Sequence, residues 1–83
     1  MRVPVVFRMS MWHNGANAAQ HSDRPYPMFM NVPGLKVIAP ATPSDMKGML
    51  KSAIRDDDPV IVFEDNDLWG RKEAVSTDPD FLV

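Results

Sequence analysis

The most constraining feature of the sequence is the run VIVFED at residues 60–65, which follows the polar stretch RDDDP. Four consecutive apolar residues, three of them β-branched, are typical of a strand that is covered on both faces in a parallel sheet. The run therefore predicts that other elements of the fold pack above and below this strand.

Two further runs predict strands. Residues 3–7 read VPVVF and also indicate a strand covered on both faces, with Pro4 at its start or edge because proline has no backbone N–H. Residues 35–40, LKVIAP, alternate weakly between apolar and polar residues and end at a proline. We expect the strand at 35–40 to be the parallel partner of the strand at 3–7.

A helix is predicted to begin after Thr42, whose hydroxyl can cap it, with Pro43 at the first helical position and Asp45 near the positive end of the helix dipole. The apolar residues that follow form a single stripe at helical spacing: Met46, Met49, Leu50, Ala53 and Ile54. Gly48 costs about 1 kcal/mol relative to alanine in a helix. We expect that this glycine allows a close approach to the sheet.

The remaining segments are less regular. Residues 8–23 have no clear periodicity and predict a long loop, residues 27–32 predict one or two helical turns, and residues 71–83 predict a polar C-terminal tail or linker. The order of elements predicts an α/β fold, a partial open parallel sheet of about three strands with crossover helices. The short helices predicted here cannot cover both faces of such a sheet. We therefore expect the chain to be part of something larger or to self-associate.

Composition excludes several classes of protein. The 83 residues carry a net charge of -2 with scattered Lys and Arg, which argues against a nucleic-acid partner. No apolar run approaches the roughly 20 residues needed to span a bilayer, and no signal peptide is evident, so we expect no membrane partner and a cytoplasmic location. The absence of cysteine excludes a thiolate nucleophile, a disulfide framework and a sulfur-based zinc site.

Four blocks occur in one order: VPVVFR, AAQHS, VPGLKVIAP and LKSAIRDDDPVIVFED. In this respect the chain resembles the beta subunit of thiamine-diphosphate-dependent 2-oxo acid dehydrogenases, over roughly residues 2–70. The resemblance implies that residues 1–70 form the second half of a transketolase-like pyrimidine-binding domain. This sequence departs from the family's pattern at MSMWHNG, where the family commonly has a glycine- and proline-rich run.

The resemblance also implies cofactors and partners. Such enzymes decarboxylate a 2-oxo acid oxidatively and transfer the acyl group to lipoyl, with thiamine diphosphate and magnesium as cofactors. An alpha subunit holds the diphosphate and magnesium, and a lipoyl acyltransferase accepts the product. The family's cofactor-activating glutamate belongs to a segment upstream of the 3–7 strand. We therefore expect the chain to be inactive by itself and to bind no thiamine diphosphate alone.

His21, in AAQHS, is the candidate catalytic residue, because the resemblance places it at the active-site histidine of the beta subunit. A histidine can donate or accept a proton near neutral pH. A solvated loop histidine with no role is the alternative that the residue alone would favour. His13 and His21 lack the further ligands that a zinc site needs.

A second candidate site lies at AIRDDD, residues 53–58, where carboxylates follow the negative end of the helix. The resemblance implies a potassium site whose ligands are backbone oxygens and two carboxylates: Val5, Ala53, Ile54, Asp56 and Asp58. A solvated acidic helix end remains the alternative.

Weaker candidates are an ion pair between Arg8 and Asp23, and acid or base roles for Glu64 and Asp65 at a strand end. Two other functions remain open beside the enzymatic one. The chain can be a catalytically silent fragment that forms a homo-oligomer through exposed apolar faces and edges, or an interaction module that reuses the fold without cofactor.

Overall fold

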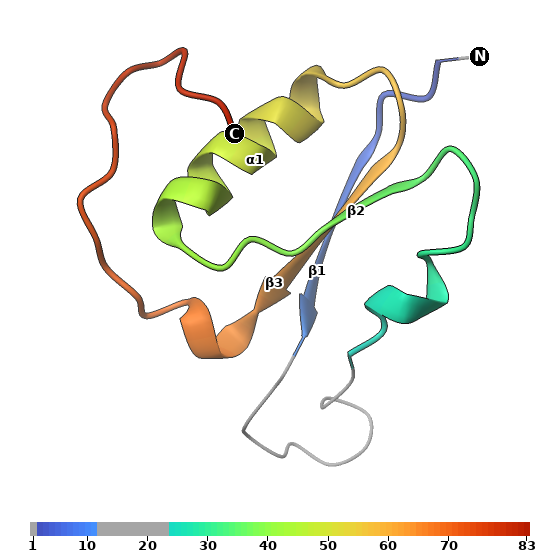
Figure 1. Cartoon of the computed structure of the whole chain (residues 1–83), viewed down its shortest axis with the longest axis horizontal. Helices are drawn as coiled ribbons and strands as arrows, with labels where there is room; N and C mark the ends of the chain where they lie inside the picture. The colour runs from blue at the N-terminus through green and yellow to red at the C-terminus, as the bar shows by residue number, and fades with distance from the viewer. Residues whose placement is uncertain (1, 12–23) are drawn as a thin grey trace.

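The computed structural model describes residues 2–11 and 24–83. A parallel sheet and a single α-helix dominate this part of the chain (Figure 1). The elements in chain order are β1 (Val6–Met11), the 3-10 helix η2 (Tyr26–Met28), β2 (Lys36–Ile38), α1 (Pro43–Arg55), β3 (Val60–Asp65) and the 3-10 helix η3 (Asn66–Leu68). The predicted α/β class, with three parallel strands, is confirmed.

The strand β3 lies in the middle of the sheet, and the strand order is β1-β3-β2. Val6 of β1 and Lys36 of β2 are both paired with Val60, on opposite edges of β3. The expectation that the strand at 35–40 pairs with the strand at 3–7 is therefore wrong. The central place goes to β3 because its apolar residues occupy both faces, whereas β2 begins with an exposed lysine.

The first strand is longer at its C-terminal end than predicted. It runs from Val6 to Met11, so residues 8–11 belong to the sheet and not to the loop. In the described part of the chain β1 pairs only with β3, and Phe7 is 50% exposed, so the prediction of cover on both faces is wrong for this strand. The alternation of β1 does bury Met11, which explains why the strand continues beyond VPVVF.

Two apolar clusters lie on opposite faces of β3. On one face Ile61 and Phe63 pack with Met11 and with half-buried residues around η2, including Tyr26 and Phe29. The ring centroids of those two aromatic residues lie 6.1 and 6.0 Å from that of Phe63. The predicted helical turns at 27–32 are thus a single 3-10 turn that covers this face.

On the other face, Val60 and Val62 pack against α1. The predicted helix start is confirmed, since the Thr42 hydroxyl accepts a hydrogen bond from the Asp45 N–H at 3.1 Å. Met46, Leu50 and Ala53 of the predicted stripe contact the sheet. Ile54 does not and is 63% exposed, because at 100° per residue it lies roughly 80° around the helix from Met46.

The C-terminal segment, residues 71–83, contains no helix or strand and runs along the outer side of α1 (Figure 1). Gly48 is buried against this segment: a Cβ there would lie 2.5 Å from Val83 Cγ2. The close approach predicted for Gly48 therefore exists, but its partner is the C-terminal segment and not the sheet.

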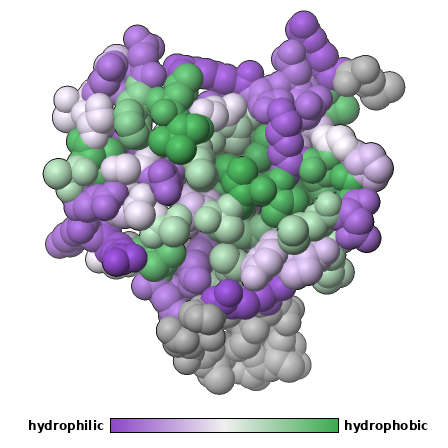
Figure 2. All heavy atoms as spheres, in the orientation of Figure 1, coloured by the Kyte–Doolittle hydropathy of each residue, from purple (hydrophilic) through white to green (hydrophobic). Residues whose placement is uncertain are grey.

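The molecule is thin, with principal extents of 38 × 36 × 14 Å. Apolar residues gather in the middle of the face shown in Figure 2, and several large apolar side chains stay exposed. They are Val3, Val5, Phe7, Met28, Met30, Val32, Ile54, Trp69, Leu82 and Val83. Among the described residues, no helix is long and apolar enough to cross a membrane. This incomplete cover agrees with the expectation that the chain belongs to a larger body.

Candidate functional site

A pocket of about 420 Å³ opens where the strands β1 and β3 run towards their carboxyl ends. Its walls come from β1, the connection from β2 to α1, the first turns of α1, and η3 with the residues that follow it. The lining residues are Arg8, Pro40, Ala41, Thr42, Pro43, Met46, Lys47, Leu50, Glu64, Asp65, Leu68, Trp69 and Arg71. The carboxyl edge of an open α/β sheet is where such folds bind ligands.

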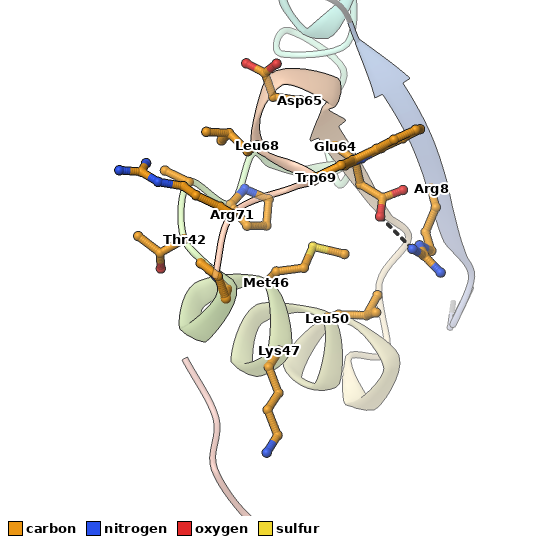
Figure 3. Close-up of a pocket in the computed structure, with 13 residues that line it drawn as sticks. Arg8, Thr42, Met46, Lys47, Leu50, Glu64, Asp65, Leu68, Trp69 and Arg71 are labelled. Carbon is orange, nitrogen blue, oxygen red and sulfur yellow. Dashed lines mark hydrogen bonds and ion pairs between the residues drawn. The ribbon is translucent and has the colours of Figure 1, made fainter. Parts of the chain in front are cut away.

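The pocket has an apolar side and a charged side (Figure 3). Met46 and Leu50 rise from α1, and Leu68 follows from η3. Across from α1, the side chains of Arg8 and Glu64 point towards each other from neighbouring strands. A pocket of this kind can enclose an apolar group while charged groups fix its orientation.

The charged side is built by the parallel register of β1 and β3. Arg8 is paired with Val62, so its side chain lies on the same face as Glu64 two residues on. The Arg8 Nη2 lies 2.5 Å from Glu64 Oε1, and the hydrogen bond from this pair raises the pKa of the guanidinium. Glu64 is the less exposed partner, with 17% of its side chain accessible against 55% for Arg8. The carboxylate is therefore held in place at the pocket wall.

Asp65 faces the opposite side of the sheet from Glu64 and forms a longer ion pair, 3.5 Å, with Arg24. Both carboxylates proposed as acids or bases thus lie beside arginines. The weaker prediction that Arg8 pairs with Asp23 stays a prediction, because Asp23 lies outside the described residues. Among the described residues, Arg8 bonds to Glu64.

His21 also lies outside the described residues, as does His13. The assignment of His21 as a catalytic residue therefore stays a prediction. The described chain ends at Met11 and resumes at Arg24, at the same carboxyl edge as the pocket.

The predicted potassium ligands lie just before β1, at the end of α1 and in the turn before β3, at the opposite edge of the sheet. The Val5 carbonyl accepts a hydrogen bond from the Val60 N–H at 2.9 Å, and the Ala53 carbonyl accepts one from the Asp56 N–H at 3.2 Å. Asp56 Oδ1 accepts from the Asp58 N–H, which folds the turn between α1 and β3.

A lysine takes part in this turn. Lys36 Nζ lies 2.5 Å from Asp56 Oδ2 and 3.5 Å from Asp58 Oδ2, and its hydrogen bond lowers the pKa of the Asp56 carboxyl. The Lys36 ammonium therefore supplies the positive charge beside these two carboxylates in the structure. Among the described residues, no group of three or more acidic or histidine side chains could hold a metal ion. The potassium site stays a prediction.

Comparison with known proteins gives the family. Residues 1–71 match the transketolase pyrimidine-binding domain family. The chain belongs to this family. The parallel sheet of β1, β2 and β3 with its crossover through α1 is the part of that fold that this chain supplies.

The curated relatives are beta subunits. The chain is 51% identical over 72 residues, 87% of its length, to the acetoin:2,6-dichlorophenolindophenol oxidoreductase subunit beta of Cupriavidus necator. It is 42% identical over 83 residues, its whole length, to the pyruvate dehydrogenase E1 component subunit beta of Rhizobium meliloti. It covers 21% and 18% of these two proteins, so it spans about a fifth of the relatives that it matches.

Several residues of the pocket were not identified from the sequence as part of a binding site. Trp69 was not assigned a role from the sequence, yet it lines the pocket while 64% exposed. Thr42 was identified as a helix cap, and Arg71 was placed in the tail. The available signal was the position of Glu64 and Asp65 at the carboxyl end of a strand.

Proposed function

We propose that this chain forms part of the beta subunit of a thiamine-diphosphate-dependent 2-oxo acid dehydrogenase. The parent enzyme would decarboxylate a 2-oxo acid oxidatively and transfer the acyl group to lipoyl. The observation that carries the proposal is the identity of 42–51% to beta subunits along 87–100% of this chain, together with the family match.

The proposed activity belongs to a larger assembly, because the chain spans about a fifth of its relatives. An alpha subunit would hold the diphosphate and magnesium, and a lipoyl acyltransferase would receive the acyl group. Thiamine diphosphate, when bound, stabilises the carbanion that decarboxylation produces.

His21 is proposed to hold or move a proton near the reacting carbons. The support is the AAQHS block and the entry of residues 12–23 from the carboxyl end of β1, the edge at which open α/β sheets bind ligands. The potassium ion is proposed to lie at the other edge of the sheet, where it would brace the turn between α1 and β3. Its carboxylate ligands would be Asp56 and Asp58, which Lys36 now contacts.

The test uses the full-length beta subunit assembled with its alpha subunit. Replacing His21 with alanine should lower the rate of reductive acylation by roughly 10²–10⁴-fold, the usual contribution of a positioned proton-transfer group. His13→Ala is the matched control, since it makes the same change eight residues away and should retain most activity. Unchanged reductive acylation in the His21→Ala enzyme would show that the role assigned to His21 is wrong.

One observation favours a second candidate, a self-associating fragment without catalysis. Val3 and Val5 just before β1, and Phe7 within it, are 39–50% exposed, and the outer edge of β1 has no strand partner among the described residues. Exposed apolar strand edges promote association. Light scattering of the 83-residue chain at micromolar concentration distinguishes the two: a stable monomer would contradict self-association, and it would leave the enzymatic proposal untouched.

A further inference from the structure

On the outer side of α1, helix side chains donate hydrogen bonds to backbone carbonyls of an extended stretch of chain. These bonds do not depend on which side chains the extended stretch carries. Lys51 Nζ donates to the Pro79 carbonyl at 2.6 Å, the Ser52 hydroxyl donates to the Val83 carbonyl at 2.8 Å, and Lys47 Nζ donates to the Ser76 carbonyl. Three positions on one side of the helix thus contact three backbone carbonyls, and any extended chain of suitable length offers the same acceptors.

At both ends of the extended stretch, the contacts with α1 depend on particular residues. At the start of α1, the Ser44 N–H donates to the Glu73 carboxylate at 2.8 Å, which lowers the pKa of Glu73. Ser44 is in the first helical turn, whose backbone N–H groups have no partner within the helix. Further along the helix, the bare Cα of Gly48 lies against Val83. The surface therefore suits an extended segment with a carboxylate near one end and a small apolar residue near the other.

The segment that occupies this surface is loosely held. Of residues 71–83, only Val75 and Phe81 are half-buried, and the rest are exposed. Detaching the segment therefore uncovers little apolar surface. Stretches with few buried apolar contacts open at low free energy, well before the domain unfolds.

Residues 70–72, which connect this segment to the rest of the fold, make few contacts. The Arg71 N–H donates to the Leu68 carbonyl at 3.0 Å, which completes the turn of η3. The next residue along the segment that bonds to α1 is Glu73. Gly70 is exposed, and a Cβ there would meet nothing within 4 Å. Residues 70–72 can therefore change direction at the cost of the single hydrogen bond from Arg71 to Leu68 and without uncovering buried residues, as the hinge of an exchanged element must.

We propose that the outer side of α1 is a docking surface for the C-terminal segment of a second copy of this chain, exchanged for the chain's own segment. In the exchanged dimer each contact of residues 73–83 with α1 is kept, and only residues 70–72 change conformation. A flexible tether gives the chain's own segment an effective concentration of roughly millimolar. The dimer should therefore accumulate as the protein concentration approaches that range.

The test exploits the absence of cysteine from the chain. Two single variants, Ser52→Cys and Val83→Cys, are mixed at high micromolar concentration in a glutathione redox buffer, with a mass tag on one of them. Exchange should yield a disulfide-linked heterodimer at several times the level formed by a control pair, Ser10→Cys with Val83→Cys. Ser10 is exposed on β1, far along the chain from the segment.

Two companion experiments make each outcome decisive. The double variant Ser52→Cys with Val83→Cys should close within one chain when dilute and link two chains increasingly as concentration rises. Adding Gly48→Ala to the Ser52→Cys copy fills the place of Val83 and should reduce heterodimer to the control level. A heterodimer yield equal to that of the control pair, or a double variant that forms no disulfide at any concentration, overturns the proposal.

Discussion

Replacing Gly48 with alanine separates the stability of the helix from the attachment of the C-terminal segment. In the present structure the new Cβ would lie 2.5 Å from Val83 Cγ2 and 2.8 Å from the Val83 backbone nitrogen, both closer than real Cβ contacts. One of these atoms is backbone, so a rotamer change of Val83 cannot relieve the overlap. The segment must move away from α1.

Two effects of similar size then oppose each other. Alanine stabilises a helix interior relative to glycine by about 1 kcal/mol. Moving Val83 breaks its hydrogen bond with Ser52 and should weaken the nearby bond between Lys51 and Pro79. Exposed hydrogen bonds of this kind contribute roughly 0.5 kcal/mol each. The free energy of global unfolding should therefore change by less than about 1 kcal/mol. The detached segment should nevertheless populate its open form about fivefold more, since about 1.4 kcal/mol corresponds to tenfold.

The assay is digestion by a carboxypeptidase followed by mass spectrometry. When opening is fast relative to cleavage, the cleavage rate follows the population of the open form. Gly48→Ala should therefore lose its last residues about fivefold faster than the parent chain. Gly70→Ala serves as the control, because its Cβ meets nothing within 4 Å, and it should be digested at the parental rate. Equal digestion of the Gly48→Ala and parent chains would refute the contact between Gly48 and Val83.

Three further perturbations test the rest of the fold. Phe63→Ala removes a fully buried ring and should cost about 3–5 kcal/mol, enough to unfold so small a domain in circular dichroism, whereas Phe7→Ala at a half-exposed position should cost far less. Gly34→Ala should raise the free energy of the folded state by about 1–2 kcal/mol in urea titrations, because Gly34 has φ +80°. Hydrogen bonds lower the pKa values of Asp56 and Glu73 below their ordinary 3.8 and 4.5. The stabilisation from these two carboxylates is therefore present above pH 4.5 and should be lost as pH falls through the folded pKa values, so the urea midpoint should drop there. A variant with Asp56→Asn and Glu73→Gln should show a smaller drop in its urea midpoint.

The fold could be predicted from the sequence wherever a local pattern has one physical solution. Thr42 followed by proline and Asp45 can only be read as a helix start, and the structure has the cap at that position. The run at residues 60–65 has the same bounds in the structure as in the prediction. Both signals depend on neighbours in sequence, which is why one chain is enough to identify them.

Strand order and packing partners depend on residues distant in sequence. Nothing in LKVIAP distinguishes a strand beside β1 from a strand beside β3, because either neighbour would satisfy its backbone groups. For Gly48, the sequence indicates a close approach but cannot identify Val83 as the partner. The pocket was missed for the same reason, since Arg8 and Trp69 meet only after β3 has paired with β1.

The candidate catalytic residue shows a different limit. His21 was identified only through a resemblance, since the loop around it has no periodicity and no metal-ligand spacing. The family match supports the resemblance without testing the residue's role. The chemistry of the residue alone says that a histidine can move a proton near neutral pH, but it does not assign the residue a reaction.

The central position of β3 has a consequence for the order in which the protein forms during synthesis. Both β1 and β2 pair with β3, and Val6 and Lys36 meet the same residue, Val60. A ribosome makes β3 after both of its partners. Until residue 65 has left the exit tunnel, the two earlier strands have no pairing partner among the described elements, and their apolar edges are open to other chains. Long-range parallel pairing of this kind folds slowly and is exposed to aggregation meanwhile. The three strands described here therefore pair in one late step, and the rate of that step decides how much chain is lost to aggregates.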